Sequence, residues 1–526
     1  MLTGDSHQNH VSLAISSIPA PSTIPAPSDI PPAPATQQSP IFTPSGTWSS
    51  GKKMYVVLVG LILNFNTTFS SSLPSGSIDS LDAAFHVTQS QQVALPVAVF
   101  LVGYVVGPLI FGPLSEHFGR KAGLVLAFAL YTAFTLACSL APTWPSLLIF
   151  RFLVGCGASA PQTITGGMYS DIYPDLLHRG RAVTLLGLTS NVGPLIGPVV
   201  AGFSSARDWR WMFWISLIMA VVTWPLLWFM PETRNHDLAT TTGSKSGDRT
   251  QLNMAAITAV NLKKFLVVGL TRPMRMLLEP LVFSTNLFLA YQYAILFLYF
   301  EAYPIIFKGT YGMNSGVAAC MLLPIGAGAI AAIFIFLWYD RFLENAKSRE
   351  KQWSKSEEYR RLPLACLGGP MFAISQFWLA WSAKPSVHWS VPAMSGVAYG
   401  IGIDLTYLAL QNYLTDAYGV YSASALASSV FTRNILAALL LPFATQPLYK
   451  HLGTGWACTL LGILCTLLVP IPFVFIRYGQ VLRTHSRFLR QLRQLEQVAD
   501  SHEGPRNLEN AKSNGDGDVD HSLPML

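Results

Sequence analysis

Long apolar runs separated by shorter polar segments dominate the chain between residues 54 and 476. The runs are about 20 residues long, which is the length that an α-helix needs to cross the hydrocarbon core of a bilayer. Twelve of them lie at 54–74, 92–112, 122–141, 146–168, 182–203, 210–230, 279–303, 316–339, 362–382, 391–412, 421–447 and 455–476. The pattern predicts an all-α membrane protein with twelve transmembrane helices.

A longer polar stretch separates the sixth run from the seventh and divides the helices into two sets of six. Its middle, Thr240–Thr250, reads TTTGSKSGDRT, a composition typical of a flexible linker. The first fifty residues are polar and hold nine prolines between Pro19 and Pro44, which predicts disorder. The predicted organisation is a disordered tail (1–50), a six-helix bundle (51–230), a linker (231–278), a second six-helix bundle (279–476) and a tail that is basic and then disordered (477–526).

The charge of the chain changes this picture in one respect, because it orients the helices. Charged residues make up only 12% of the sequence, about half the share typical of soluble domains. If the N-terminus is cytoplasmic, 27 of the 34 Lys and Arg residues fall on the cytoplasmic side and five on the outer side. The positive-inside bias therefore predicts that both termini are cytoplasmic. We expect a multi-pass protein of the cell membrane, with the vacuolar membrane as the alternative.

The loop after the second run carries a compact set of small and charged residues, Gly112, Glu116, Gly119, Arg120 and Lys121. Two glycines bracket a carboxylate and the segment ends on a basic pair. This arrangement predicts a tight turn whose charges hold two helix ends in one of two arrangements. The alternative is a simple turn that follows the positive-inside bias.

The fourth run opens with an arginine, Arg151, followed by Gly155 and Gly157. An arginine inside a span is costly and usually faces a cavity or a partner, and glycines allow helices to pack closely. The alternative is an arginine that extends its side chain toward the outer membrane interface.

The fifth run contains two Gly-Pro pairs in mid-membrane, Gly193-Pro194 and Gly197-Pro198. Such pairs bend a helix and let its backbone approach a neighbour closely. The alternative is a kink without further function.

These three patterns resemble the signature motifs of the major facilitator superfamily, and the third resembles the antiporter motif of its drug:proton antiporters. Further stretches resemble the fungal twelve-spanner branch: Asp208-Trp-Arg-Trp-Met-Phe-Trp214, Pro231-Glu-Thr-Arg234, Glu301-Ala-Tyr-Pro304, Arg361-Leu-Pro-Leu-Ala365 and Asn412-Tyr-Leu-Thr-Asp-Ala-Tyr418. The resemblance covers about 53–483. It implies two six-helix bundles that rock around a central cavity, with export driven by proton influx. The chain departs from the family pattern at Glu116, where Asp is frequent, and at His117, where a basic residue is common.

Ionisable residues inside or beside the spans are the candidates for proton coupling. Asp404 lies near the centre of the tenth run, and we hypothesise that it pairs with Arg433 on the eleventh and that protonation loosens this pair. A static ion pair is the alternative. Arg151 belongs to the same set, and Glu301 and Glu279 flank the seventh run near opposite membrane faces as second-ranked proton sites.

Uncharged polar residues at mid-depth are candidates for the wall of the cavity. For each Asn and Gln, hydrogen bonding between helices is the alternative interpretation. The candidates are Asn64, Asn191, Tyr291, Gln292, Tyr407 and Asn434.

The favoured function is a proton-coupled secondary transporter that exports a small hydrophobic or amphipathic compound, such as a drug or a fungal secondary metabolite. Export of polyamines or small organic acids is the alternative: buried acids favour cations, the arginines favour anions, and the sequence contains both. No HExxH, GxSxG or phosphate-binding loop points to an enzyme or a nucleotide-driven pump. The expected partners are the substrate, protons and the lipid bilayer. We expect a monomer without cofactor, metal or nucleic acid.

Overall fold

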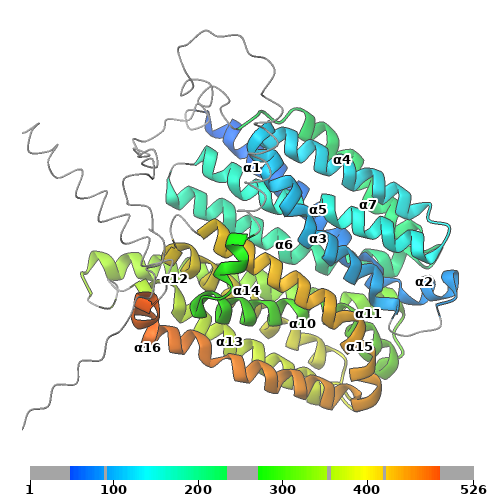
Figure 1. Ribbon diagram of the computed structural model, residues 1–526. Helices are drawn as coiled ribbons and strands as arrows, with labels where there is room; N and C mark the ends of the chain where they lie inside the picture. Colours follow the sequence, from blue (N-terminus) through cyan, green and yellow to red (C-terminus); the bar gives the residue numbers. More distant parts are fainter. Residues whose placement is uncertain are drawn as a thin grey trace, which may run out of the picture. The chain divides into compact units, whose positions relative to one another are not determined.

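The computed structural model describes residues 48–87, 92–173, 175–233, 271–351, 353, 357–418 and 422–485. In this part of the chain twelve helices are long and apolar enough to cross a membrane, and they pack side by side (Figure 1). The described residues form helices and connecting segments without strands, so the predicted all-α class with twelve spans is confirmed. The predictions for residues 1–47, for 234–270 of the linker and for the tail after 485 lie outside the described residues.

The first half of the chain contributes six long helices. Short helical segments connect the first two of them: η3 (Leu73–Gly76), α2 (Ile78–Phe85) and η4 (Gln92–Ala94). The long helices are α1 (Ser50–Ser72), α3 (Leu95–Phe118), α4 (Arg120–Ser139), α5 (Trp144–Ile172), α6 (Leu176–Ser204) and α7 (Trp211–Trp228). A helix satisfies most of its backbone groups internally, as a segment surrounded by hydrocarbon requires.

The second half repeats this organisation after the linker. Its helices are α10 (Pro280–Tyr311), the short α11 (Ser315–Cys320), α12 (Leu323–Ser348), α13 (Glu357–Ser382), α14 (Ser390–Tyr418), α15 (Ser422–Leu468) and α16 (Pro470–His485). Two spans lie in α15 and α16, Ser424–Thr445 and Pro447–Gly479. Within α15 the backbone leaves the helical region at Gly453, where φ is 73°.

All twelve predicted spans overlap an observed helix, but several helices are longer than their apolar runs. The seventh run was placed at 279–303, whereas α10 continues to Tyr311 past Pro304 and Lys308. Glu301 lies more than two helical turns from the end of α10 and is 2% exposed, and its position near a membrane face stays a prediction. A polar residue or a proline ends a hydrophobic run without ending the helix.

Helices α3 and α5 of the first half cross at glycines. A Cβ atom on Gly103 would overlap the backbone oxygen of Phe152, and a Cβ atom on Gly155 would overlap that of Phe100. Because both obstacles are backbone atoms, they cannot rotate away as a side chain could. The two helices therefore approach as closely as small residues allow.

Helices α12 and α14 make the corresponding crossing in the second half. A Cβ atom on Gly328 would overlap the backbone oxygen of Val397, and one on Gly400 would overlap that of Ile325. In each half the crossing joins the second and fourth long helices. This correspondence is what two structurally repeated six-helix units would produce.

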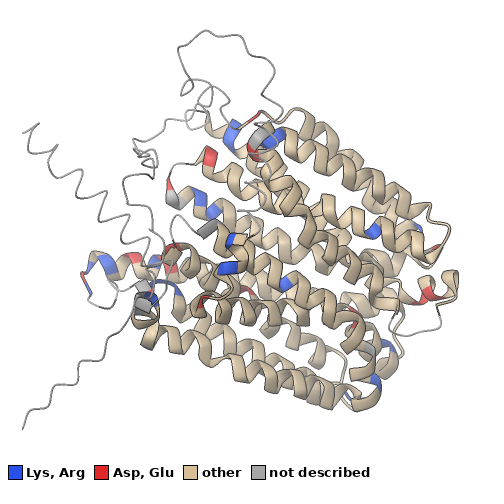
Figure 2. Cartoon of the chain, viewed as in Figure 1, with Lys and Arg blue, Asp and Glu red and all other residues tan. Residues whose placement is uncertain are grey.

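The two ends of the helices differ in what they carry. We call one the α2 end, where α2 and α11 connect the helices, and the other the arginine end, where Arg120, Arg361 and Arg483 lie. Charged residues are sparse along most of the helix length (Figure 2). The few charged groups inside the spans are therefore conspicuous.

Candidate functional site

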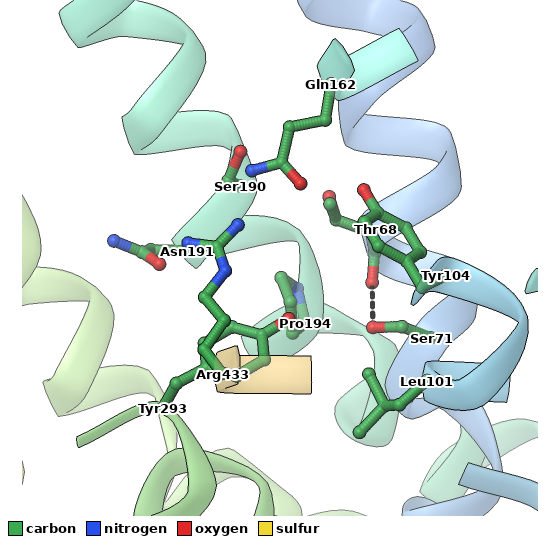
Figure 3. A pocket seen from close by; sticks show the side chains of 10 residues that line it. All are labelled: Thr68, Ser71, Leu101, Tyr104, Gln162, Ser190, Asn191, Pro194, Tyr293 and Arg433. Carbon is green, nitrogen blue, oxygen red and sulfur yellow. Dashed lines mark hydrogen bonds between the residues drawn. The ribbon is translucent and has the colours of Figure 1, made fainter. Parts of the chain in front are cut away.

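A small cavity with a largely polar set of lining residues lies between the two halves of the chain. Figure 3 shows its wall, to which α1, α3, α5 and α6 of the first half and α10 and α15 of the second contribute side chains. The lining residues are Thr68, Ser71, Leu101, Tyr104, Gln162, Ser190, Asn191, Pro194, Tyr293 and Arg433. Most of them are polar, although every helix involved crosses the apolar middle of the bundle.

Arg433 is the charged residue of this wall and is 4% exposed. The centre of its guanidinium lies 4.9 Å from the ring centroid of Tyr293 and 5.5 Å from that of Tyr407. Aromatic faces attract a cation and hold its position. The Nε atom is buried without a hydrogen-bond partner, and no salt bridge among the described residues involves Arg433.

Asp404 on α14 is 5% exposed and contacts the first half of the chain. Its Oδ1 accepts a hydrogen bond from the side-chain amide of Asn191 on α6. Its Oδ2 is buried without a hydrogen-bond partner. This bond joins the two halves directly beside the cavity, because Asn191 also lines the cavity wall.

The expected ion pair between Asp404 and Arg433 is not formed: the salt bridges of the described residues do not include it. Asp404 bonds to Asn191 instead, and the ring of Tyr407, about one turn further along α14, lies beside the guanidinium. The positions of two residues within consecutive spans predict that they lie at a similar depth in the membrane. They do not predict which neighbouring helix each side chain faces.

Arg151 on α5 lies outside the cavity wall and is fully buried. It donates three hydrogen bonds of 3.0 Å, from Nε to Pro96 O, from Nη1 to Ser70 O and from Nη2 to Ser71 O. The serine carbonyls belong to the last turn of α1, where helix carbonyls lack intrahelical donors. The guanidinium thus ties the end of α1 to the start of α3, and does not extend to a membrane face.

The two glutamates of the seventh span also lie outside the cavity wall. Glu301 is buried in the middle part of α10, and Glu279 directly precedes that helix and is 7% exposed. They occupy different depths along the same helix. Neither contributes to the wall that contains Arg433.

Several predicted cavity residues bond to other helices instead. Asn64 donates from Nδ2 to the hydroxyls of Thr189 and Ser190, each at 2.9 Å, and so joins α1 to α6. The hydroxyl of Tyr291 donates to the backbone oxygen of Leu461. For these two residues the structure shows the contacts of the helix–helix alternative.

Gln292 and Asn434 are buried side chains without a place in the cavity wall. Asn434 donates to Val430 O in its own helix at 2.8 Å, and both polar atoms at the end of the Gln292 side chain lack a hydrogen-bond partner. Of the six predicted cavity residues, Asn191 lines the wall and Tyr407 lies directly behind it against Arg433.

The lining residues that were not among the sequence candidates include Thr68, Ser71, Tyr104, Gln162 and Ser190. Tyr104 and Gln162 satisfy the same criterion that selected the others, a polar side chain deep inside a span. Thr68 and Ser71 gave a weaker signal, because their hydroxyls also bond to carbonyls of their own helix, as in many transmembrane helices.

The Gly-Pro segment of α6 packs directly on α1. A Cβ atom on Gly193 or on Gly197 would overlap atoms of α1. Pro198 has no N–H group, so the carbonyl of Pro194 lacks its usual helical donor. The hydroxyl of Ser72 donates to that carbonyl at 2.6 Å. The segment therefore forms a close helix contact at the cavity, with a serine in place of the missing backbone donor.

The turn between α3 and α4 forms as predicted, around Gly119 with φ at 100°. The carboxylate of Glu232, which follows α7, accepts the backbone N–H groups of Arg120 at 2.8 Å and Lys121 at 3.0 Å. Lys121 Nζ in turn donates to Trp228 O at 2.7 Å. Glu232 therefore caps the N-terminus of α4 from the segment that follows α7.

The expected charge network of this turn uses other carboxylates than the predicted one. Arg120 Nε lies 3.3 Å from Asp171 Oδ2, and Arg120 Nη1 donates to Ser115 Oγ at 3.1 Å. Glu116 is exposed. The participating carboxylates, Asp171 and Glu232, are distant in sequence from the turn and are brought to it by α5 and α7.

The second half carries a similar cluster at its arginine end. Arg361 on α13 lies 3.6 Å from Asp340 on α12 and 3.4 Å from Asp416 on α14. In both halves, therefore, an arginine near the start of the third long helix contacts an aspartate near the end of the fourth.

At the α2 end the two halves touch. Asp79 on α2 forms an ion pair with Lys308 on α10 and accepts a hydrogen bond from Ser315 Oγ at 3.3 Å. A Cβ atom on Gly202 of α6 would lie 2.9 Å from the Cα of Gly316 on α11. A charged contact and a close backbone contact therefore join the halves at this end.

Comparison with known proteins places this architecture among transporters. The model of the Major Facilitator Superfamily matches residues 60–442. The efflux pump FUBT of Fusarium oxysporum is 33% identical over 472 residues, which cover 86% of this chain and 78% of the relative. The multidrug transporter mdrA of Aspergillus fumigatus is 30% identical, over 84% of this chain and 73% of the relative.

Solved structures share the fold at low sequence identity. The crystal structure of a D-xylose-proton symporter superimposes with a TM-score of 0.58 at 18% identity, over 79% of this chain and 97% of the symporter. An inward open conformation of the xylose transporter XylE from E. coli gives a TM-score of 0.59 at 16% identity, over 80% and 96% of the two chains.

Proposed function

Because this chain belongs to the major facilitator superfamily, we propose that it is a proton-coupled secondary transporter that exports a small hydrophobic or amphipathic compound by alternating access. The chain is a multi-pass membrane protein with twelve apolar helices. Its fungal relatives named as efflux pumps and multidrug transporters support export of a drug or secondary metabolite. Membership in a transporter family also supports a function other than catalysis.

The hydrogen bond between Asn191 and Asp404 is the observation that carries the proposal. A carboxylate buried among membrane helices is costly as an ion and readily takes a proton. A hydrogen bond to a charged group is worth about 1.5–3 kcal/mol and a neutral one about 0.5–1.5 kcal/mol. Protonation of Asp404 therefore weakens the link between the halves by about 1 kcal/mol, which shifts a two-state equilibrium about fivefold.

The contacts at the α2 end support alternating access. Asp79 with Lys308, and Gly202 with Gly316, hold the halves together there. With the positive-inside orientation, the α2 end faces outward and both termini are cytoplasmic. Separation of these contacts would open the cavity to the outside, in the cell membrane or, as the alternative, in the vacuolar membrane.

The test is transport by inside-out membrane vesicles that contain the full chain. With an acidic interior, uptake of a neutral amphipathic dye such as Nile red should exceed that of vesicles without the protein and should stop when a protonophore dissipates the gradient. Asp404→Asn should abolish the gradient-dependent part, because the amide cannot release a proton. Glu116→Gln, the same change at an exposed position, should leave it unchanged. Full gradient-dependent uptake by Asp404→Asn would refute proton coupling at this residue.

A further inference from the structure

The ionisable side chains inside the spans differ in how their charge is used. Arg151 donates to three backbone carbonyls, and Asp404 accepts from Asn191. Both therefore have protein partners that occupy them. Arg433 lines the cavity, has an unpartnered buried Nε and forms no salt bridge within the described part of the chain. Its charge is directed at the space that the substrate would occupy.

The groups that face Arg433 do not neutralise it. Tyr293 and Tyr407 present ring faces to the guanidinium, and the hydroxyl of Tyr104 is buried without a hydrogen-bond partner. Asp404, about one turn from Tyr407 on α14, bonds to Asn191. Figure 3 shows the guanidinium directed toward the polar side of the cavity, where Ser190, Asn191 and Gln162 lie.

From this arrangement, and resting on the proposed export function, we propose that the transported compound is an organic anion whose carboxylate binds Arg433. A planar guanidinium matches a carboxylate with two parallel hydrogen bonds, and it always carries its charge. Leu101, Pro194 and the tyrosine rings provide apolar contacts for the body of such a compound. Of the alternatives that the sequence left open, the cavity favours small organic acids over polyamines.

The tyrosines have a positioning role in this site. Because two rings flank the guanidinium, it keeps one orientation while the cavity is empty, and less side-chain entropy is lost when an anion binds. The side-chain amide of Gln162 on the opposite wall supplies a neutral donor to the same anion.

The test is equilibrium binding of two probes to the purified full chain in lipid nanodiscs. Tritiated 1-naphthoate is bound directly, and unlabelled 1-naphthoate or 1-naphthamide competes; the two competitors differ only in the charge of one group. A charge-assisted bidentate contact predicts that the carboxylate competes about 10- to 100-fold better than the amide. Arg433→Gln should remove this preference, Arg433→Lys should retain part of it, and Arg210→Gln, an arginine at the α2 end paired with Asp208, should retain all of it.

A double variant separates an anion site from simple charge balance. If Arg433 serves only to offset Asp404, then Arg433→Gln combined with Asp404→Asn should restore wild-type binding of 1-naphthoate. In an anion site the double variant remains as defective as Arg433→Gln alone. Restored binding, equal competition by the amide, or no naphthoate binding by the wild-type chain would each overturn the proposal.

The binding test of the anion site and the transport test of the proposed function can fail separately. Uptake of Nile red without any Arg433-dependent preference for naphthoate refutes the anion site and leaves the proposed function standing. An Arg433-dependent preference in a chain that moves no probe along a proton gradient refutes the proposed function and leaves the anion site standing.

Discussion

Arg151 and Arg433 are the two buried arginines among the described residues, and the structure predicts opposite consequences for their removal. In Arg151→Met, three backbone carbonyls at the ends of α1 and α3 lose their donor in a fully buried place. A buried polar group left without its partner costs about 1–3 kcal/mol. In Arg433→Met, no salt bridge is lost among the residues described, and the contacts of the guanidinium with Tyr293 and Tyr407 are replaced by apolar ones.

The summed effect at Arg151 is about 3–6 kcal/mol, since neighbouring groups relax and the three terms are not fully additive. This is a large part of the 5–15 kcal/mol by which folded proteins are usually stable. At about 2–4 °C per kcal/mol, Arg151→Met should lower the apparent melting temperature by about 6–24 °C. Arg433→Met should melt within about 2 °C of the wild-type chain and fail in transport.

The assay is thermal denaturation of the detergent-solubilised chain, fused to a fluorescent protein and followed by size-exclusion chromatography. Arg151→Lys is the intermediate control, because a single ammonium can reach only part of the three carbonyls. A wild-type melting temperature for Arg151→Met together with lost transport would refute the structural role of Arg151. It would return this residue to the proton-coupling candidates.

Two further predictions concern the ends of the helices. Glu232→Gln should lower the melting temperature modestly, because the α4 N-terminus loses a charged cap worth about 1 kcal/mol. The same change at exposed Glu116 should have no effect in the same assay. Equal effects of the two variants would contradict the capping role of Glu232. Asp79→Asn should loosen the α2 end, because it removes the ion pair to Lys308, which is worth up to about 1 kcal/mol at an exposed site. The rate at which an impermeant maleimide labels Cys320 on α11 should then increase up to about fivefold. Labelling of Cys320 at the wild-type rate would show that the ion pair does not hold this end closed. The Cys320→Ser variant measures the labelling of all other cysteines.

The positions of the spans could be predicted from the sequence because each depends on a local property. A run of apolar residues must form a helix in lipid, whatever its neighbours are. Helix ends were less predictable, and α10 extends eight residues beyond its predicted end at residue 303. Lys308 and Pro304 interrupted the apolar run, yet the backbone continues as a helix through both.

The candidate site was predictable in depth and unpredictable in direction. Asn191, Asp404 and Arg433 were found because a polar side chain in mid-membrane is costly wherever it points. Which of them meet was not predictable, since a helix that is apolar on all sides gives no periodic signal for the face it turns inward. Asp404 therefore bonds to Asn191 in the other half of the chain instead of to Arg433.

By itself, the sequence determined the all-α class, the twelve spans, their division into two sets of six and the short set of polar residues buried among them. These follow from hydrophobicity and chain length, which act residue by residue. Only the tertiary structure decided that Arg151 donates its hydrogen bonds to backbone carbonyls and that Glu232 caps α4. It also decided that Arg433, flanked by two tyrosine rings, faces a cavity. Those facts depend on helix rotation and on partners that lie on other helices or beyond them in the sequence. Packing of close-fitting surfaces, such as the glycine crossings of α3 with α5, determines both.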